Sequence, residues 1–179
     1  DRRKRGDFKS ALSQASRVID RVYEAPFYAH ATIEPPAAIA RWEGGKLEIW
    51  APTQHPQWAK ESVAEATGVE LADITVHVTL LGGAFGRKSK PDFLVEAALL
   101  AKETGMPIRV QWTREDDLHH DFFHSHSAQR IRATLDSNRR LTGWNHHTVF
   151  PAIGATSNAD ELHPSDGELG LGCIDFPFQ

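Results

Sequence analysis

Hydrophobic residues recur at helical spacing in two stretches of the chain. The first covers residues 54–67 and ends at Gly68, and Thr53 can cap its N-terminus. The second follows Pro91 and ends at Gly105, since proline is favoured at the start of a helix and glycine just after its end. Its apolar positions predict one buried face, made of Phe93, Leu94, Ala97, Ala98 and Ala101.

Alternating hydrophobic and polar residues predict strands around these helices. The most regular run is 74–80, where Ile, Val and Leu alternate with Thr and His. Residues 37–42 and 47–51 flank Glu-Gly-Gly-Lys, which predicts a hairpin. Further extended segments are predicted at 22–27, 108–112, 131–135 and 144–150, with a turn at 136–139. The order favours an α+β fold, with a mixed or antiparallel sheet and two main helices.

The 179 residues are enough for one domain. We expect residues 1–20 to be a linker or tail, because they hold a basic run (DRRKR) and only a short helical pattern. Residues 21–150 are expected to form the α+β domain. Residues 151–179 are rich in Gly, Pro and Asp, and we expect an irregular segment that continues in a longer parent chain.

Composition excludes several classes of protein. Hydrophobic residues make up 40% and charged residues 25%, which is typical of a folded globular chain. No apolar run approaches the length of a membrane span. The net charge of −4 argues against nucleic acid as the main partner. Cys173 is the single cysteine, so the chain cannot ligate an iron–sulfur cluster by itself; we expect a packing role for it.

A glycine-rich loop at residues 82–86 joins a predicted strand to a predicted helix. Backbone N–H groups in such a loop can approach an anion closely. A P-loop alignment ending at Lys88 puts Arg87 where the second glycine belongs, and no start position satisfies the dinucleotide fingerprint. A tight turn without a ligand is the alternative.

Histidines and acidic residues cluster further along. Four histidines fall within eight residues, and we interpret them as a polar loop, because no third metal-ligand pattern accompanies them: His119, His120, His124 and His126. The run at 114–117 (REDD) is expected to cap a helix N-terminus.

Four segments, in order, resemble motifs of molybdenum hydroxylase large subunits. They are residues 28–36 (YAHATIEPP, similar to HA-x-x-EP), 51–56 (APTQHP, similar to TQ), 81–88 (LGGAFGRK, similar to GGGFG-x-K) and 111–117 (QWTREDD, similar to x-R-x-ED). The chain is identified by this resemblance as a first molybdopterin-binding domain of the xanthine dehydrogenase/aldehyde oxidase family. The subgroup resembles isoquinoline 1-oxidoreductase β subunits and related aldehyde dehydrogenases.

The resemblance implies a cofactor, a reaction and partners. The cofactor is molybdopterin, whose cytosine dinucleotide form is one option, and the protein supplies no direct metal ligand. The implied reaction is hydroxylation of an aldehyde or an N-heteroaromatic compound with water as oxygen source. Electrons would pass to 2Fe–2S clusters on a small partner subunit, beside the remainder of the molybdenum subunit. Periplasm and cytoplasm both stay open as locations.

The resemblance also implies site residues. Gln54 would hydrogen-bond an oxygen ligand of molybdenum, and the backbone N–H groups of Phe85 and Gly86 would face the cofactor. His124 would lie in the substrate pocket. The full cofactor-binding set is Gln54, Gly82, Gly83, Ala84, Phe85, Gly86 and Arg87.

The chain departs from the family pattern in three places. Ala84 replaces the middle glycine of the triplet, which predicts a negative φ there. Ser89 stands where xanthine-type enzymes carry a substrate-binding glutamate, which disfavours a purine substrate. No segment matches the G-x-GE motif of the general base, so that glutamate is expected beyond this chain and the chain alone is expected to be inactive. A non-catalytic fragment or scaffold of the same fold, or a P-loop-like phosphate binder, are the alternatives.

Overall fold

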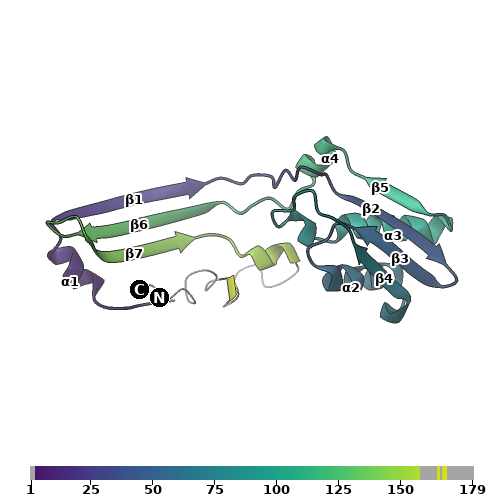
Figure 1. The fold of residues 1–179 in the computed structure, drawn as a ribbon, viewed down its shortest axis with the longest axis horizontal. Coiled ribbons are helices and arrows are strands. Elements are labelled where there is room, and N and C mark those ends of the chain that lie inside the picture. The colour runs from purple at the N-terminus through teal and green to yellow at the C-terminus, as the bar shows by residue number, and fades with distance from the viewer. Residues whose placement is uncertain (1–2, 158–164, 166, 169–179) are drawn as a thin grey trace. The chain divides into compact units, whose positions relative to one another are not determined.

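The computed structural model describes residues 3–157, 165 and 167–168, and the chain divides into two compact units (Figure 1). Unit 1 is built from Asp1–Tyr28 and His124–Gln179, and unit 2 from Ala29–Phe123. The α+β prediction is confirmed, although the strands form two separate sheets instead of one. In the described residues, no helix has the length and apolar character needed to cross a membrane.

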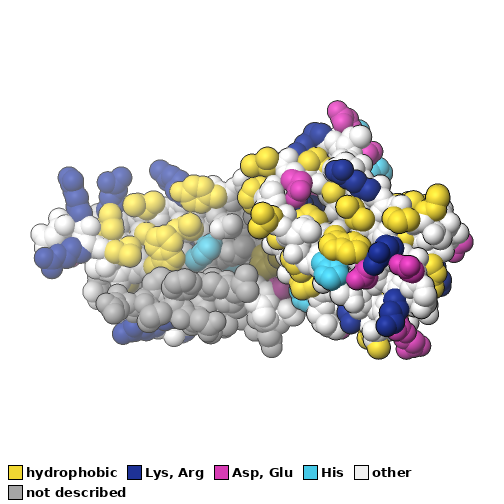
Figure 2. Space-filling model, turned by 45° about the vertical axis from the view of Figure 1, so that its right-hand side comes forward, with side chains coloured by type: hydrophobic (Ala, Val, Ile, Leu, Met, Phe, Trp, Pro, Cys, Tyr) yellow, Lys and Arg dark blue, Asp and Glu magenta, His cyan; other side chains and the backbone are white. Residues whose placement is uncertain are grey.

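Unit 1 is a three-stranded antiparallel sheet in the order β1-β6-β7. Its strands are β1 (Arg17–Ala25), β6 (Ser127–Leu135) and β7 (Leu141–Val149), with α1 (Phe8–Ser13) and a 3₁₀ turn (Ile153–Ser157) beside them. β1 starts inside the segment expected to be a linker, because all nine of its residues pair with β6. Hydrophobic side chains are exposed on this unit, with Lys and Arg at its edges (Figure 2).

Unit 2 is a four-stranded mixed sheet in the order β4-β3-β2-β5. The strands are β2 (Ala37–Glu43), β3 (Lys46–Ala51), β4 (Ile74–Val78) and β5 (Ile108–Gln111), and only the pairing of β3 with β4 is parallel. The helices are α2 (Pro56–Thr67), α3 (Asp92–Thr104) and α4 (Arg114–His119), with 3₁₀ turns at Leu71–Asp73 and Arg87–Ser89.

The core of unit 2 lies where α2 and α3 pack on the sheet (Figure 1). The predicted apolar face of α3 is buried in full, and its alanines let the helix approach β2 closely. Gly68 and Gly105 end the two helices with φ of +69° and +67°, as their positions predict. The buried partners include Ala40, Leu47, Ile49, Val63 and Ile74.

Two predicted boundaries are wrong. Helix α2 begins at Pro56, and its cap is His55, whose Nδ1 accepts from the N–H of Trp58. Thr53 instead donates its hydroxyl to the carbonyl of Lys88, so it ties the helix start to the loop. The predicted strand 74–80 ends at Val78, because its partner β3 ends at the paired residue. Leu80 is accordingly 94% exposed.

Two leucines of α3 offer a matched test of this packing. Leu94 is fully buried and Leu99 is 37% exposed. Leu94→Ala should lower the free energy of unfolding by about 2–5 kcal/mol, because it opens a cavity in the core. Leu99→Ala should lower it by less than about 1 kcal/mol. Urea unfolding of both variants measures this, and equal losses would contradict the assigned core.

Candidate functional site

The first and third motif segments are bound to each other in unit 2. The N–H of Glu34 donates to the carbonyl of Gly82 at 2.8 Å, and the N–H of Gly82 donates back to Glu34 Oε2 at 3.1 Å. The same Oε2 accepts from Lys88 Nζ at 2.6 Å. The side chain of Lys88 is fully buried. The carboxylate of Glu34 therefore fixes both ends of the loop.

The second motif segment holds the loop through Gln54. Its N–H donates to the carbonyl of Lys88 at 2.9 Å, and its Oε1 accepts from the N–H of Gly86 at 3.2 Å. Because a backbone N–H can only donate, it must face the amide oxygen of Gln54 and not the NH₂ group, and this sets the orientation of the carboxamide. The Nε2 hydrogens of the exposed Gln54 have no protein acceptor within the described part of the chain. Gln54 therefore offers two donors to a ligand.

The loop backbone has left-handed φ values at three of its five residues. Gly83, Phe85 and Gly86 have φ of +84°, +53° and +105°, whereas Ala84 stays out of the left-handed region, as predicted. A positive φ at a phenylalanine is strained and persists only where surrounding contacts hold it. Among the described residues, the N–H groups of Gly83, Ala84 and Phe85 donate to no protein acceptor. The loop therefore presents three successive donors beside the amide of Gln54. The N–H of Gly86, which we expected to face the cofactor, donates to Gln54 Oε1 instead.

Two glycines are required by close approach. A Cβ at residue 82 would lie 2.5 Å from Cβ of Glu34. A Cβ at residue 86 would lie 3.3 Å from Nε2 of His30, at a φ that L-residues rarely adopt. His30 and Glu34 both belong to the first motif segment, so the loop and that segment fit only with glycine at these positions.

Arg87 supports the loop from beneath. Its side chain is fully buried, and its two terminal nitrogens donate to Asp92 at 2.9 and 2.7 Å. Its Nε lies 3.2 Å from Asp121 Oδ1, and its guanidinium lies 5.2 Å from the ring centres of both Trp112 and Phe122. We expected Arg87 among the cofactor-binding residues, and this stays a prediction; its side chain is fully buried among these neighbours.

The fourth motif segment forms helix α4. Thr113 and Asp116 make a capping box, which confirms that the acidic run caps a helix. Arg114 pairs with the buried carboxylate of Asp117 at 2.6 Å and donates to the carbonyl of Ile33 at 2.8 Å. The segment is thereby bound to the first one, and all four motif segments form one connected network.

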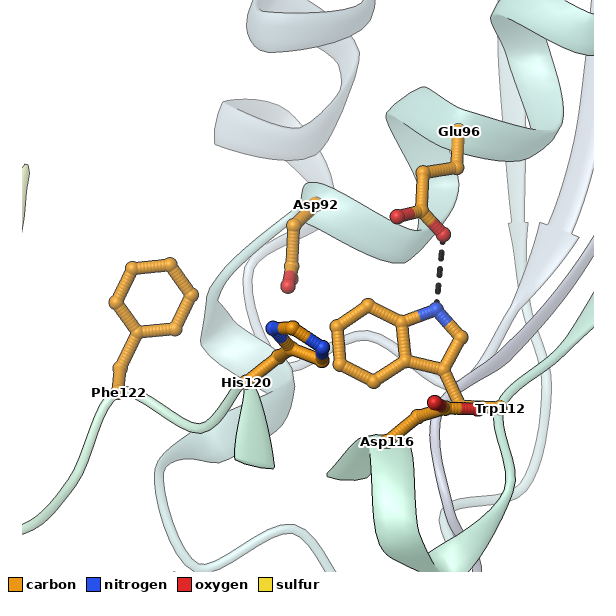
Figure 3. Close-up of a pocket in the computed structure, with 6 residues that line it drawn as sticks. All are labelled: Asp92, Glu96, Trp112, Asp116, His120 and Phe122. Atoms are coloured by element: carbon orange, nitrogen blue, oxygen red, sulfur yellow. Dashed lines mark hydrogen bonds between the residues drawn. The ribbon is translucent and has the colours of Figure 1, made fainter. Parts of the chain in front are cut away.

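Unit 2 contains a cavity of about 350 Å³ (Figure 3), and three of its lining residues, Asp92, Trp112 and Phe122, also contact the guanidinium of Arg87. It is lined by Asp92, Glu96, Trp112, Asp116, His120 and Phe122. Each carboxylate already has a partner: Asp92 binds Arg87, Glu96 accepts from the indole N–H of Trp112 at 2.8 Å, and Asp116 caps α4. No group of three metal-ligating side chains is found among the described residues. The residues that line the cavity are best explained as packing around the side chain of Arg87.

His124 lies in unit 1, whereas the other predicted site residues lie in unit 2. Its ring stacks on Tyr28 with centroids 4.6 Å apart, and its N–H donates to the carbonyl of Tyr28. Its place in a substrate pocket stays a prediction. Cys173 lies outside the described residues.

Sequence reasoning missed Asp121, which binds His30 through both its backbone N–H and its ring nitrogen Nδ1. The side chain of Asp121 is fully buried. Its one signal in the sequence is a carboxylate placed between histidines and two phenylalanines, in a segment that we interpreted as a polar loop.

The buried environment of the network shifts the pKa values of Glu34 and Asp117 in opposite directions. Burial pushes the pKa of Glu34 up, but hydrogen bonds from Lys88 and from the N–H of Gly82 outweigh it and hold the pKa below its ordinary value. Burial raises the pKa of Asp117, and the charge of Asp121 adds to this, while Arg114 and Arg87 oppose it.

Because Lys88 is buried against Glu34, it lacks the access to phosphate that a P-loop lysine needs.

Residues 1–169 match the family model described as the molybdopterin cofactor-binding domain. The chain belongs to this family. It is 33% identical over 140 residues to the membrane-bound aldehyde dehydrogenase [pyrroloquinoline-quinone] of Gluconacetobacter polyoxogenes. The alignment covers 78% of this chain and 18% of the relative. It is 34% identical over 129 residues to isoquinoline 1-oxidoreductase subunit beta of Brevundimonas diminuta, covering 71% of this chain and 16% of the relative.

The fold is also that of solved molybdenum enzymes. Aldehyde oxidoreductase from Desulfovibrio gigas superposes with a TM-score of 0.69 at 18% identity, over 81% of this chain and 16% of that one. The molybdopterin cofactor-binding domain described here thus spans less than a fifth of the length of these three proteins. The resemblance to molybdenum hydroxylases is confirmed.

The ion pair between Glu34 and Lys88 can be tested by removing its charge. Glu34→Gln keeps an acceptor oxygen but leaves a buried ammonium without a counter-charge, so the free energy of unfolding should fall by about 1–3 kcal/mol. Glu43→Gln is the control, since that side chain is 75% exposed, and it should change stability by less than about 0.5 kcal/mol. Urea unfolding at pH 7 compares them, and similar losses in both would refute the role of Glu34.

The raised pKa of Asp117 predicts a pH-dependent effect. The folded state binds the proton more tightly than the unfolded chain, so ionised Asp117 lowers stability above its folded pKa and has no such effect below its ordinary value of 3.8. Asp117→Asn should therefore raise Tm at pH 7, and the gain should shrink towards pH 4, which thermal unfolding of both proteins across this pH range measures. A lower Tm at pH 7 would mean that the pair with Arg114 dominates instead.

Proposed function

We propose that this chain is the part of a molybdenum hydroxylase catalytic subunit that holds one side of the molybdenum cofactor. The observation that carries the proposal is the hydrogen bond from the N–H of Gly86 to Gln54 Oε1, because it turns the amide hydrogens of Gln54 outward. The free N–H groups of Gly83, Ala84 and Phe85 lie in the same loop. Together they form a donor surface without a competing carboxylate, since Glu34 is engaged by Lys88 and Gly82.

This donor set fits the cofactor. Molybdopterin carries oxygen, sulfur and phosphate groups, all of which accept hydrogen bonds, and a strained, glycine-rich backbone brings N–H groups close to such acceptors. When bound, the cofactor would supply the two-electron oxidation of the substrate, with water as the source of oxygen. Gln54 would donate to an oxygen ligand of molybdenum, and the loop would donate from its backbone. Arg87 and Lys88 would keep the loop in place without touching the cofactor.

The substrate we propose is an aldehyde or an N-heteroaromatic compound. Relatives named for aldehydes and for isoquinoline support this class, as does Ser89 in the place of a purine-binding glutamate. His124 is our candidate for substrate contact. With Cys173 as its single cysteine, this chain needs a partner to carry the 2Fe–2S clusters that would take the electrons. The cytosine dinucleotide is a proposed form of the cofactor.

The proton chemistry of the reaction is not assigned to this chain. Its buried carboxylates each hold a structural cation or cap, and no G-x-GE segment is present in the sequence. We propose that the general base is a glutamate elsewhere in the subunit and that this chain alone is inactive. A scaffold that binds no cofactor is the alternative.

Gln54→Ala in the assembled enzyme tests the proposal. Loss of the outward amide should reduce turnover per molybdenum about 10–100-fold, the usual effect of removing a hydrogen bond near a metal. Gln57→Ala is the control, because Gln57 is exposed on α2 and, within the part of the chain that the structure describes, its side chain binds Glu61 alone. The turnover of this variant should stay within about two-fold of wild type. Unchanged turnover in Gln54→Ala would refute its role. Absence of molybdenum from the assembled wild-type enzyme would favour the scaffold.

A further inference from the structure

Residues 120–122 have no regular secondary structure, yet the side chains of Asp121 and Phe122 contact Arg87, and that of His120 contacts Trp112, which also lies over Arg87. Phe122 lies over it at 5.2 Å, Asp121 lies beside its Nε, and His120 meets the edge of Trp112 on the other side with ring centroids 6.1 Å apart. Figure 3 shows His120, Phe122 and Trp112 around the same cavity. This segment comes directly after α4 and supports Arg87, the residue that follows the glycine-rich loop.

Asp121 is the middle residue of this segment and contacts both Arg87 and His30. Its side chain is fully buried, and His30 beside it is only 9% exposed. Oδ2 accepts from the backbone N–H of His30, Oδ1 lies 3.0 Å from His30 Nδ1, and Oδ1 also lies 3.2 Å from Arg87 Nε. Because a buried carboxylate accepts only, the contact with Nδ1 requires that this nitrogen carry the hydrogen. The ring of His30 is thereby fixed in one orientation.

Both contacts of Asp121 lead to the turn that carries Phe85 and Gly86. Through His30, the far ring nitrogen Nε2 is held against the face of Gly86, 3.3 Å from where a Cβ would be. Through Arg87, whose own N–H donates to the carbonyl of Ala84 at 2.8 Å, the other end of the turn is fixed. Asp121 thus connects the two sides of the strained turn from below.

Charge balance does not explain this carboxylate. The bidentate pair with Asp92 already supplies Arg87 with a counter-charge. A second, fully buried carboxylate adds a desolvation cost, which is offset here by its three contacts with His30 and Arg87. What Asp121 adds beyond Asp92 is the orientation of His30.

We propose that Asp121 is a positioning residue of the cofactor site, acting on the Phe85–Gly86 turn through the ring of His30 and the guanidinium of Arg87. This inference rests on the proposed function in one respect: the positioned donors of the loop and of Gln54 face the cofactor. The positioning itself is a property of this chain and is measurable without the cofactor.

The test compares Asp121→Asn with Asp117→Asn in the full-length subunit assembled with its partners. Asp117 is the control: it is also fully buried and lies four residues earlier, and its charge acts on Asp121 and Arg87 only through space. Its ion-pair partner is Arg114, and among the described residues it makes no hydrogen bond to His30 or to the loop. The first readout is amide hydrogen exchange at Gly86, Arg87 and Ser89, which hydrogen bonds protect. Helix α2 is the internal reference. The second readout is molybdenum content with turnover per molybdenum.

Asp121→Asn places an amide donor against the donors of His30 and Arg87, so exchange in the loop should accelerate about 10-fold or more while α2 is unchanged. Molybdenum content or turnover per molybdenum should fall about 10–100-fold. Asp117→Asn should stay within about two-fold in every readout. Equal acceleration in the loop and in α2, or equal effects of the two variants, would overturn the inference, since either means general destabilisation.

His30→Asn completes the test, because asparagine keeps an N–H near the position of Nδ1 and removes the half of the ring that carries Nε2. Combined with Asp121→Asn, it should accelerate loop exchange by less than the product of the separate factors. A full product would overturn the His30 connection. If Asp121→Asn fails to fold, His30→Asn alone must accelerate exchange in the loop, and no change there overturns the inference. If the variants change hydrogen exchange in the loop as expected but the assembled wild-type enzyme contains no molybdenum, the proposed function is refuted. The positioning role of Asp121 then still stands.

Discussion

Burial of the Arg87 guanidinium sets the conditions for the rest of the site. A charge taken completely out of water is stable only where carboxylates and aromatic faces replace the lost hydration. Here the replacements come from separate parts of unit 2: Asp92 at the start of α3, Trp112 after β5, and Asp121 and Phe122 after α4. Their convergence fixes where the glycine-rich loop must lie, because Arg87 is the residue that follows it.

The second buried cation, Lys88, completes this arrangement from the other side. Glu34 neutralises it and also receives the N–H of Gly82, so one carboxylate holds both ends of the loop. Between these anchors the backbone adopts left-handed φ values at Gly83, Phe85 and Gly86. The basic residues of the loop are therefore structural, and the groups left for a ligand are backbone N–H donors and the amide of Gln54.

Much of this fold follows from sequence pattern. The buried face of α3 and the glycines that end both helices were predictable from spacing, because local propensity and burial agree there. The φ of Ala84 was predictable from the steric demand of its Cβ. Gln54 lies beside the loop, and its hydrogen bond to an oxygen ligand of molybdenum, which the family resemblance implies, stays a prediction.

Other features depend on tertiary contacts that no local pattern contains. The role of Arg87 is set by Asp121 and Phe122, more than thirty residues away, and a basic residue in an anion loop is otherwise expected to meet the ligand. The division of the strands into two sheets depends on the pairing of β1 with β6, which are separated by the whole of unit 2. Leu80 continues the alternation of β4 but has no strand beside it.

The decisive measurement is a structure of the cofactor-loaded subunit, read at the distances from Gln54 Nε2 and Phe85 N to the nearest cofactor atoms. We expect hydrogen-bond distances of about 2.8–3.3 Å at both, with Gln54 Oε1 still accepting from the N–H of Gly86. A cofactor seated away from this loop, or one that contacts the side chain of Arg87 or Lys88 instead, would contradict it.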